Sequence, residues 1–125
     1  MKKILVADDK PAGRELVRTV LESCGYEVIE AGDGVEALAS ARLHNPDLII
    51  LDIHMPSLDG FGVMRDLAKD PKLKFTPVMA LTASAMAGDR DRAEAAGFSS
   101  YMTKPIRLDI LRNEAARLLK SGARI

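Results

Sequence analysis

The sequence has a single cysteine, no excess of charge of either sign and no long hydrophobic run. Because Cys24 is the only cysteine, no intrachain disulfide can form, and a reducing cytoplasm fits better than an oxidising exterior. The 18 basic and 18 acidic residues give a formal charge of zero, which argues against a domain that holds nucleic acid by bulk electrostatics. The apolar runs are far shorter than the ~20 residues of a membrane span, and the apolar run at residues 4–7 is too short for a signal peptide.

Length and composition indicate a single globular domain. A chain of 125 residues with 47% hydrophobic and 29% charged residues lies near the average for such domains. A domain of this size can bury a full hydrophobic core without disulfides. There is no internal repeat, low-complexity tract or linker, so we expect residues 1–125 to form one domain.

Five short apolar runs alternate with longer segments of helical spacing. The runs are residues 4–7, 27–31, 48–51, 78–81 and 100–103. Strict alternation of strand and helix predicts an α/β fold of the (βα)₅ type, in which a doubly wound, parallel five-stranded sheet carries helices on both faces. Residues 27–31 and 100–103 include polar side chains, which places them at the sheet edges. The strand order 2-1-3-4-5 satisfies this and puts a crevice beside the carboxyl ends of strands one and three.

The segments between the runs predict five helices. In the first, Ala12, Leu16, Val20 and Cys24 repeat every four residues, with Val17 and Leu21 alongside. We therefore expect Cys24 to pack on an apolar stripe. The apolar stripes of the other four helices are Val35, Leu38 and Ala41; Phe61, Met64, Leu67 and Ala68; residues 86–96; and Leu108, Leu111, Ala115 and Leu118.

Polar side chains follow four of the five predicted strands at their carboxyl ends: Asp8 and Asp9, Asp52, Thr82, and Lys104. Three carboxylates gathered at one edge of a sheet repel one another unless a divalent cation takes up the charge. Mg²⁺ is the natural candidate, since it prefers oxygen ligands and shares its coordination shell with phosphate.

The hydroxyl and the ammonium complete a site for phosphoryl transfer. Thr82 and Lys104 can hold phosphoryl oxygens while the cation neutralises another, and this reaction needs little beyond such positioning and charge stabilisation. Asp52, between the acid pair on one side and Thr82 and Lys104 on the other, is the expected nucleophile. Its product is an acyl phosphate, which hydrolyses on its own, so the modification is temporary and suits a molecular switch.

These residues resemble the receiver domain of bacterial two-component response regulators. The resemblance rests on groups in the same order and spacing as in that family: Asp8-Asp9; Asp52-Ile53-His54-Met55-Pro56 with Gly60; Thr82-Ala83; and Tyr101 with Lys104-Pro105. It covers nearly the whole chain and implies a flavodoxin-like, CheY-like fold. Among single-domain members, residues 85–89 and 101–106 look most similar to the DivK type.

The resemblance implies a role for each position in the acidic pocket. Asp9, with Asp8 acting largely through water, binds Mg²⁺ together with Asp52 and the backbone carbonyl of His54; Mn²⁺ is the alternative ion. Asp52 accepts its phosphoryl group from a histidine kinase or a histidine phosphotransfer protein. Beyond its own phosphorylation and dephosphorylation, such a domain catalyses nothing and is not an enzyme.

The resemblance also implies a conformational switch. Thr82 turns toward the phosphoryl group and Tyr101 moves into the space that it leaves. This change alters the surface of the fourth helix, fifth strand and fifth helix, where a downstream protein partner binds. Lys104-Pro105 is expected to be a cis peptide, and neither nucleic acid nor membrane is an expected direct partner.

Several residues keep more than one interpretation. Tyr101 also suits plain packing, because aromatic residues favour strands. Lys10 follows the acid pair at a helix start, where the dipole disfavours a cation; its ammonium either contacts the carboxylates or phosphoryl group or points into water. His54 and Ser84 either tune the phosphoryl lifetime or are plain loop residues.

Alternative functions differ in how well they fit. A haloacid-dehalogenase-type phosphatase also uses an aspartate nucleophile, but it carries a second aspartate where this chain has His54. A nucleotide or flavin carrier lacks support, since no glycine-rich phosphate loop follows the first strand. The closest alternative is a receiver module excised from a hybrid histidine kinase or a multidomain response regulator.

Overall fold

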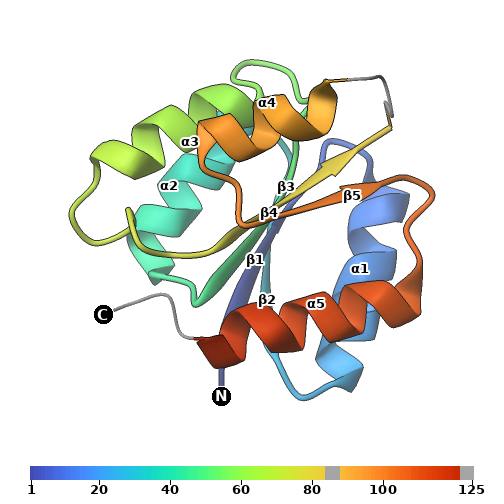
Figure 1. Cartoon of the computed structure of the whole chain (residues 1–125). Helices are drawn as coiled ribbons and strands as arrows, with labels where there is room; N and C mark the ends of the chain where they lie inside the picture. Colours follow the sequence, from blue (N-terminus) through green and yellow to red (C-terminus); the bar gives the residue numbers. More distant parts are fainter. Residues whose placement is uncertain (84–87, 122–125) are drawn as a thin grey trace.

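Strands and helices alternate along the chain, as Figure 1 shows. The computed structural model describes residues 1–83 and 88–121. The strands are β1 (Lys3–Ala7), β2 (Glu27–Ala31), β3 (Leu48–Asp52), β4 (Val78–Thr82) and β5 (Ser100–Thr103). The helices are α1 (Pro11–Ser23), α2 (Gly34–His44), α3 (Gly60–Lys69), α4 (Asp89–Ala96) and α5 (Leu108–Ser121).

All five strands are parallel and lie in the order β2-β1-β3-β4-β5. The predicted fold, strand order and edge strands are therefore confirmed. Every residue of β3 and β4 is buried, whereas the edge strands β2 and β5 contain partly exposed residues. Because all strands run in the same direction, their carboxyl ends lie at one edge of the sheet, which is where the functional side chains gather.

Helices cover both faces of the sheet, with α2, α3 and α4 on one side and α1 and α5 on the other (Figure 1). Each face has its own hydrophobic cluster. Under α2, α3 and α4 the cluster includes Leu38, Val63, Leu67, Ala93 and Phe98. Under α1 and α5 it includes Val17, Leu21, Leu111, Ala115 and Leu118. The sheet is thus buried on both sides, and its carboxyl edge remains open for a site.

The predicted apolar stripe of α1 is wrong about which residues face the core. Val17, Val20 and Leu21 are buried, but Leu16 is 48% exposed and Cys24 is exposed as well. A repeat of four residues drifts about 40° per step around a helix of 3.6 residues per turn, so a strict four-residue series leaves the buried face. Cys24 also lies beyond the end of α1, where it is the C-cap residue.

Smaller departures concern α2, α3 and α4. Val35 is 58% exposed, and Ala37 takes its place in the core. Ala68 is exposed at the far side of α3. The first described residue of α4 is Asp89, and the earlier part of the segment predicted from residue 86 lies outside the described residues.

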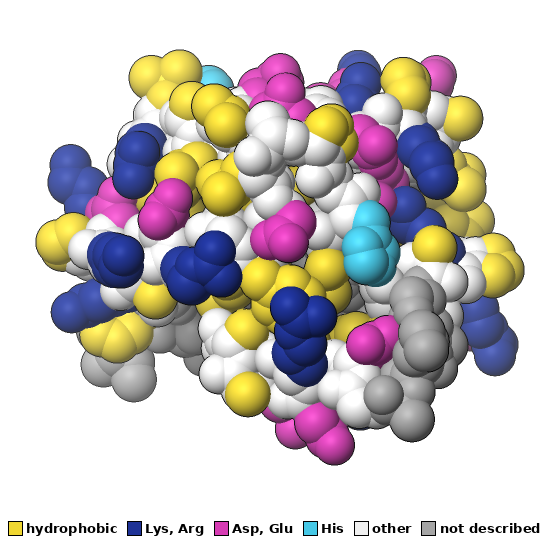
Figure 2. Space-filling view, turned by 90° about the horizontal axis from the view of Figure 1, so that it is seen from above, with side chains coloured by type: hydrophobic (Ala, Val, Ile, Leu, Met, Phe, Trp, Pro, Cys, Tyr) yellow, Lys and Arg dark blue, Asp and Glu magenta, His cyan; other side chains and the backbone are white. Residues whose placement is uncertain are grey.

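None of the described helices is long and apolar enough to cross a membrane. Seen from above, the surface has acidic, basic and hydrophobic side chains interspersed (Figure 2). This mixture agrees with the zero formal charge of the whole chain.

Candidate functional site

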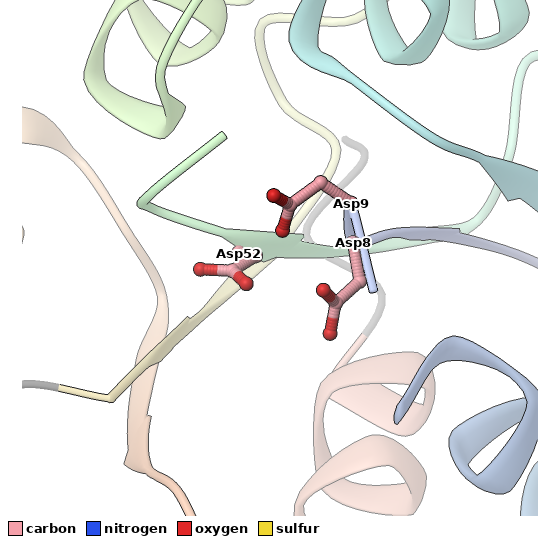
Figure 3. Close-up of side chains that lie close together, drawn as sticks. All are labelled: Asp8, Asp9 and Asp52. Atoms are coloured by element: carbon pink, nitrogen blue, oxygen red, sulfur yellow. The ribbon is translucent and has the colours of Figure 1, made fainter. Parts of the chain in front are cut away.

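Three aspartate side chains come together at the carboxyl edge of the sheet (Figure 3). Asp8 and Asp9 follow β1, and Asp52 is the last residue of the neighbouring β3. One carboxylate oxygen from each lies within 4.8 Å of the other two. Asp8 and Asp52 are almost completely buried, with 1% and 4% exposure, and Asp9 is more exposed. The sequence prediction that distant segments bring these side chains to one place agrees with this geometry.

Lys104 lies directly against the two buried carboxylates. Its Nζ is 3.0 Å from Oδ2 of Asp8 and 2.8 Å from Oδ2 of Asp52. The backbone holds this lysine in place, because its N–H donates to the carbonyl oxygen of Thr82 at 2.7 Å. The peptide bond between Lys104 and Pro105 is cis, which is the isomer that the resemblance implies.

The single ammonium of Lys104 does not fully neutralise the negative charge of the carboxylates. Burial raises the pKa of Asp52, and the nearby charge of Asp8 raises it further; the ammonium of Lys104 and the N–H of His54 oppose the shift without cancelling it. Burial by itself lowers the pKa of Lys104, but its hydrogen bonds to the two carboxylates outweigh that effect and raise it. The lysine therefore stays charged, while the negative charge on Asp52 is held at a cost that a further cation can relieve.

The loop after Asp52 folds back over the carboxylate. The backbone N–H of His54 donates to Oδ1 of Asp52 at 3.0 Å, while the His54 side chain is exposed. The N–H of Gly60 donates to the carbonyl of Ile53 at 2.8 Å. A Cβ at Gly60 would lie 2.7 Å from Cα of Ile53, so only glycine permits this close approach and the resulting loop geometry.

Thr82 and Tyr101 border a common hollow. Thr82, 2% exposed, ends β4 next to β3. It lines a cavity of about 190 Å³ together with His54, Phe61, Arg92 and Tyr101. Tyr101 is half-buried on β5, and burial raises its pKa, with a further contribution from the charge of Asp89. Tyr101 and the threonine that ends the neighbouring strand therefore line the same hollow.

Tyr101 also borders the outer face formed by α4, β5 and α5. The guanidinium of Arg90 lies over its ring, 5.4 Å from the centroid. Two hollows of about 380 Å³ and 260 Å³ lie on this face, and Tyr101 lines both. One side chain thus connects the surroundings of Thr82 to an exposed surface.

Of the remaining predicted site residues, Lys10 contacts this constellation only through its backbone. The backbone N–H of Lys10 donates to Oδ1 of Asp8 at 2.9 Å, but its side chain is exposed and forms no ion pair with any described residue. Ser84 lies outside the described residues.

The sequence analysis missed Arg14, whose Nη1 donates to the carbonyl oxygen of Asp8 at 2.8 Å.

The donor set fits a magnesium ion. Carboxylate oxygens are hard ligands, and Mg²⁺ is bound in proteins by one or two carboxylates with the remaining positions left to water or phosphate. Asp8, Asp9 and Asp52 present such oxygens close enough to share one ion. Among the residues that the structure describes, no softer ligand, such as a thiolate, belongs to this cluster.

The fold and the acidic pocket together define a signalling domain. Residues 4–116 match the response regulator receiver domain family, and the chain belongs to this family. It is therefore a CheY-like receiver of two-component signalling. Receiver domains bind Mg²⁺ in an acidic pocket, interact with histidine kinases and downstream effectors, and are generally signal transducers without enzymatic activity of their own.

Particular relatives are similar over most of their length. The polar-differentiation response regulator DivK of Brucella ovis is 41% identical over 105 residues, which cover 84% of this chain and 85% of the relative. The receiver domain of a histidine kinase from Syntrophus aciditrophicus is 34% identical, with a TM-score of 0.91 over 100% of this chain and 95% of that one. A sensor kinase receiver from Pseudomonas aeruginosa, solved with magnesium in its active site cleft, is 32% identical, with a TM-score of 0.88 over 95% and 98% of the two chains.

Proposed function

We propose that Asp52 accepts a phosphoryl group from a histidine kinase or a histidine phosphotransfer protein. An Oδ atom of Asp52 attacks the phosphorus of the donor phosphohistidine, a P–O bond forms, and the P–N bond breaks with its electron pair going to the imidazole. Water later attacks the acyl phosphate and restores the carboxylate. The observation that carries this proposal is the convergence of Asp8, Asp52 and Lys104 within hydrogen-bond distance.

The acidic pocket is the proposed magnesium site. Asp8, Asp9 and Asp52, together with the backbone carbonyl of His54, hold Mg²⁺, and Mn²⁺ can take its place. When bound, the ion neutralises the charge on a phosphoryl oxygen. The metal-bearing relative from Pseudomonas aeruginosa supports this assignment by likeness.

Lys104 and Thr82 are the proposed ligands of the remaining phosphoryl oxygens. In the unphosphorylated protein the ammonium of Lys104 is 2.8 Å from Asp52, so a short movement of its flexible side chain brings it to a phosphoryl oxygen on the same carboxylate. The hydroxyl of Thr82 donates to another oxygen from the end of β4. Lys10, His54 and Ser84 are the candidates for tuning the phosphoryl lifetime.

Phosphorylation is proposed to act through Thr82 and Tyr101 on the face of α4, β5 and α5. When Thr82 turns toward the phosphoryl group, the ring of Tyr101 moves toward the hollow that both residues line. Arg90 loses its place over the ring, and the two outer hollows change shape. A downstream protein partner then distinguishes the two states by the altered surface.

Residues 1–125 are proposed to act as a single receiver domain in the cytoplasm. All five strands belong to one sheet with one core on each face. The alternative is a receiver that belongs to a hybrid histidine kinase or a larger regulator, and the similarity to two kinase receivers is the observation that supports it. An immunoblot of the native protein in cells of its source decides between them, since a band much larger than 13.6 kDa supports the alternative.

Phosphorylation can be tested with acetyl phosphate or a histidine kinase in the presence of Mg²⁺. Intact-protein mass spectrometry of the native chain is expected to show a gain of one phosphoryl group. The Asp52→Asn variant is expected to show none, and Asp66→Asn on α3 serves as the matched control that is labelled like the native chain. Equal labelling of Asp52→Asn and the native chain contradicts the assignment of Asp52.

The switch has its own test. Beryllofluoride, which mimics a phosphoryl group on a carboxylate, is expected to shift the NMR signals of Thr82, Tyr101 and Arg90 in the presence of Mg²⁺. Signals from β2, at the opposite edge of the sheet, are the internal control. If the signals around Asp52 shift but those of Tyr101 and Arg90 do not, the switch proposal is wrong although phosphorylation stands.

A further inference from the structure

The guanidinium of Arg14 joins the backbone of the acid pair to the edge strand β2. Its Nη1 donates to the carbonyl oxygen of Asp8 at 2.8 Å. Its Nε donates to Oε1 of Glu30 at 2.9 Å. The arginine side chain is 21% exposed, so it lies partly covered between α1 and the sheet edge.

The carbonyl of Asp8 has few donors in its own neighbourhood. The chain leaves the sheet here, since β1 ends at Ala7 and α1 begins at Pro11. The N–H of Lys10 is already used by the carboxylate of Asp8, and Pro11 has no N–H. Among the described residues, no backbone N–H donates to this carbonyl, so the hydrogen bond from Arg14 orients the peptide group.

Glu30 fixes the position of the guanidinium. Its Oε2 accepts from Nη1 of Arg18 at 2.7 Å while Oε1 accepts from Arg14. The hydrogen bond from Arg14 is the largest influence that lowers the pKa of Glu30, so the carboxylate stays charged and keeps both arginines. Two charge-assisted bonds of this kind restrict a long side chain to one geometry.

We propose that Arg14 is a positioning residue for the cation in the acidic pocket. The peptide whose carbonyl it holds joins Asp8 to Asp9, so its orientation sets the directions in which both carboxylates leave the backbone. Outer hydrogen bonds that orient ligand groups commonly change metal affinity by 10-fold or more. The inference rests on the proposed magnesium site and adds a residue that does not touch the ion.

A simple effect of charge predicts the opposite result. A guanidinium near the pocket repels Mg²⁺, so removing it would strengthen binding if charge alone mattered. Loss of orientation weakens binding instead. The sign of the change in Mg²⁺ affinity therefore separates the two explanations.

The test compares Arg14→Met, Arg14→Lys and Arg18→Met in the full chain. Arg18 is the matched control, because it bonds to the same Glu30 but not to the carbonyl of Asp8. Mg²⁺ titrations followed by NMR are expected to show about tenfold weaker binding for both Arg14 variants, since lysine cannot reach both partners with its single nitrogen. Arg18→Met is expected to bind Mg²⁺ like the native chain.

A second readout separates orientation from general loosening. The amide signal of Asp9, which shares its peptide with the carbonyl of Asp8, is expected to shift in both Arg14 variants without Mg²⁺ and to stay in place in Arg18→Met. If an Arg14 variant does not fold, Glu30→Gln takes its place and is expected to weaken Mg²⁺ binding in the same direction.

The outcomes are distinct. Native or tighter Mg²⁺ binding by the folded Arg14 variants overturns the inference, and so does an equal loss in Arg18→Met. If the native chain itself binds no Mg²⁺, the proposed metal site fails first, and that failure is seen before any variant is compared.

Discussion

Asp52 is buried beside a second carboxylate, and its ionisation works against the fold. Because burial raises its pKa above the ordinary value of 3.8 even with Lys104 in contact, the folded protein holds the proton more tightly than the unfolded chain does. Stability is therefore lost as the pH rises through the folded pKa. Without Mg²⁺ at neutral pH, Asp52→Asn is expected to increase the free energy of unfolding by about 1 kcal/mol.

Urea unfolding at several pH values checks this expectation. Below pH 3.8, where the aspartate is protonated in both states, the native chain and the Asn variant should become similar in stability. A variant that is less stable than the native chain at neutral pH would show that the ion pair with Lys104 outweighs the burial of the charge.

The placement of the candidate site residues was predictable from the sequence, because each lies at or just after the carboxyl end of a strand. Asp8, Asp52 and Lys104 each stand just after an apolar run, and the carboxyl ends of parallel strands meet at one edge. Arg14 gave no such signal. It acts on a backbone carbonyl through a side-chain geometry that appears only when α1 and β2 are packed together.

At the level of elements, the loop between β3 and α3 depends on Gly60. A Cβ there meets the backbone of Ile53 at 2.7 Å, and backbone cannot move aside as a flexible side chain can. Gly60→Ala is expected to lower the free energy of unfolding by about 1–3 kcal/mol, measured by urea denaturation. Gly32→Ala is the matched control, since its Cβ meets only the end of Arg14 at 3.5 Å, and an equal loss in both variants would contradict the steric explanation.

The contact between β5 and α5 has a pH-dependent component. Arg117 and the hydroxyl of Ser100 both bond to Glu114 and lower its pKa from 4.5 to about 2. A lowered folded-state pKa contributes stability that is present above pH 4.5 and is lost as the pH falls toward 2. Because Arg117 is 56% exposed, solvent screening limits the contribution to about 1 kcal/mol.

Glu114→Gln is therefore expected to lose less stability than the native chain between pH 4.5 and 2. Ser100→Ala removes one of the two partners and is expected to fall between them. The free energy of unfolding, measured in urea across this pH range, is the readout. Parallel curves for all three proteins would mean that the contact adds no pH dependence.

The sequence predicted which segments form strands and helices better than it predicted which face of a helix is buried. Polar residues at 27–31 and 100–103 predicted the edge strands, because an edge tolerates partial exposure. The buried face of α1 did not follow, since both Leu16 and Val17 are apolar and the sequence does not say which one faces the sheet. Packing against β1 and β3 selects Val17.

At the level of the whole molecule, the acidic pocket exists only when distant segments of the chain are folded together. An ion that binds the folded state and not the unfolded chain raises the free energy of unfolding. At a free Mg²⁺ concentration 100 times its dissociation constant, the gain is expected to be about 2.7 kcal/mol. Urea denaturation with MgCl₂ measures it, with KCl at equal ionic strength as the control.

Asp9→Asn and Asp52→Asn are expected to lose most of this stabilisation, because each removes a carboxylate from the cluster. Equal stabilisation of the native chain by MgCl₂ and KCl would show that the effect is general salt screening rather than binding at the pocket.

The pairing of Lys104 with the aspartates sets the net charge of the pocket. Three carboxylates and one ammonium leave two unbalanced negative charges, so a divalent ion brings the pocket to neutrality, whereas sodium or potassium would leave it anionic. The proposed acyl phosphate on Asp52 would then restore an excess of negative charge inside the neutralised pocket. If Asp52 is phosphorylated as proposed, electroneutrality would be broken at each phosphorylation, and the neighbouring dipoles and cations would have to rearrange in response.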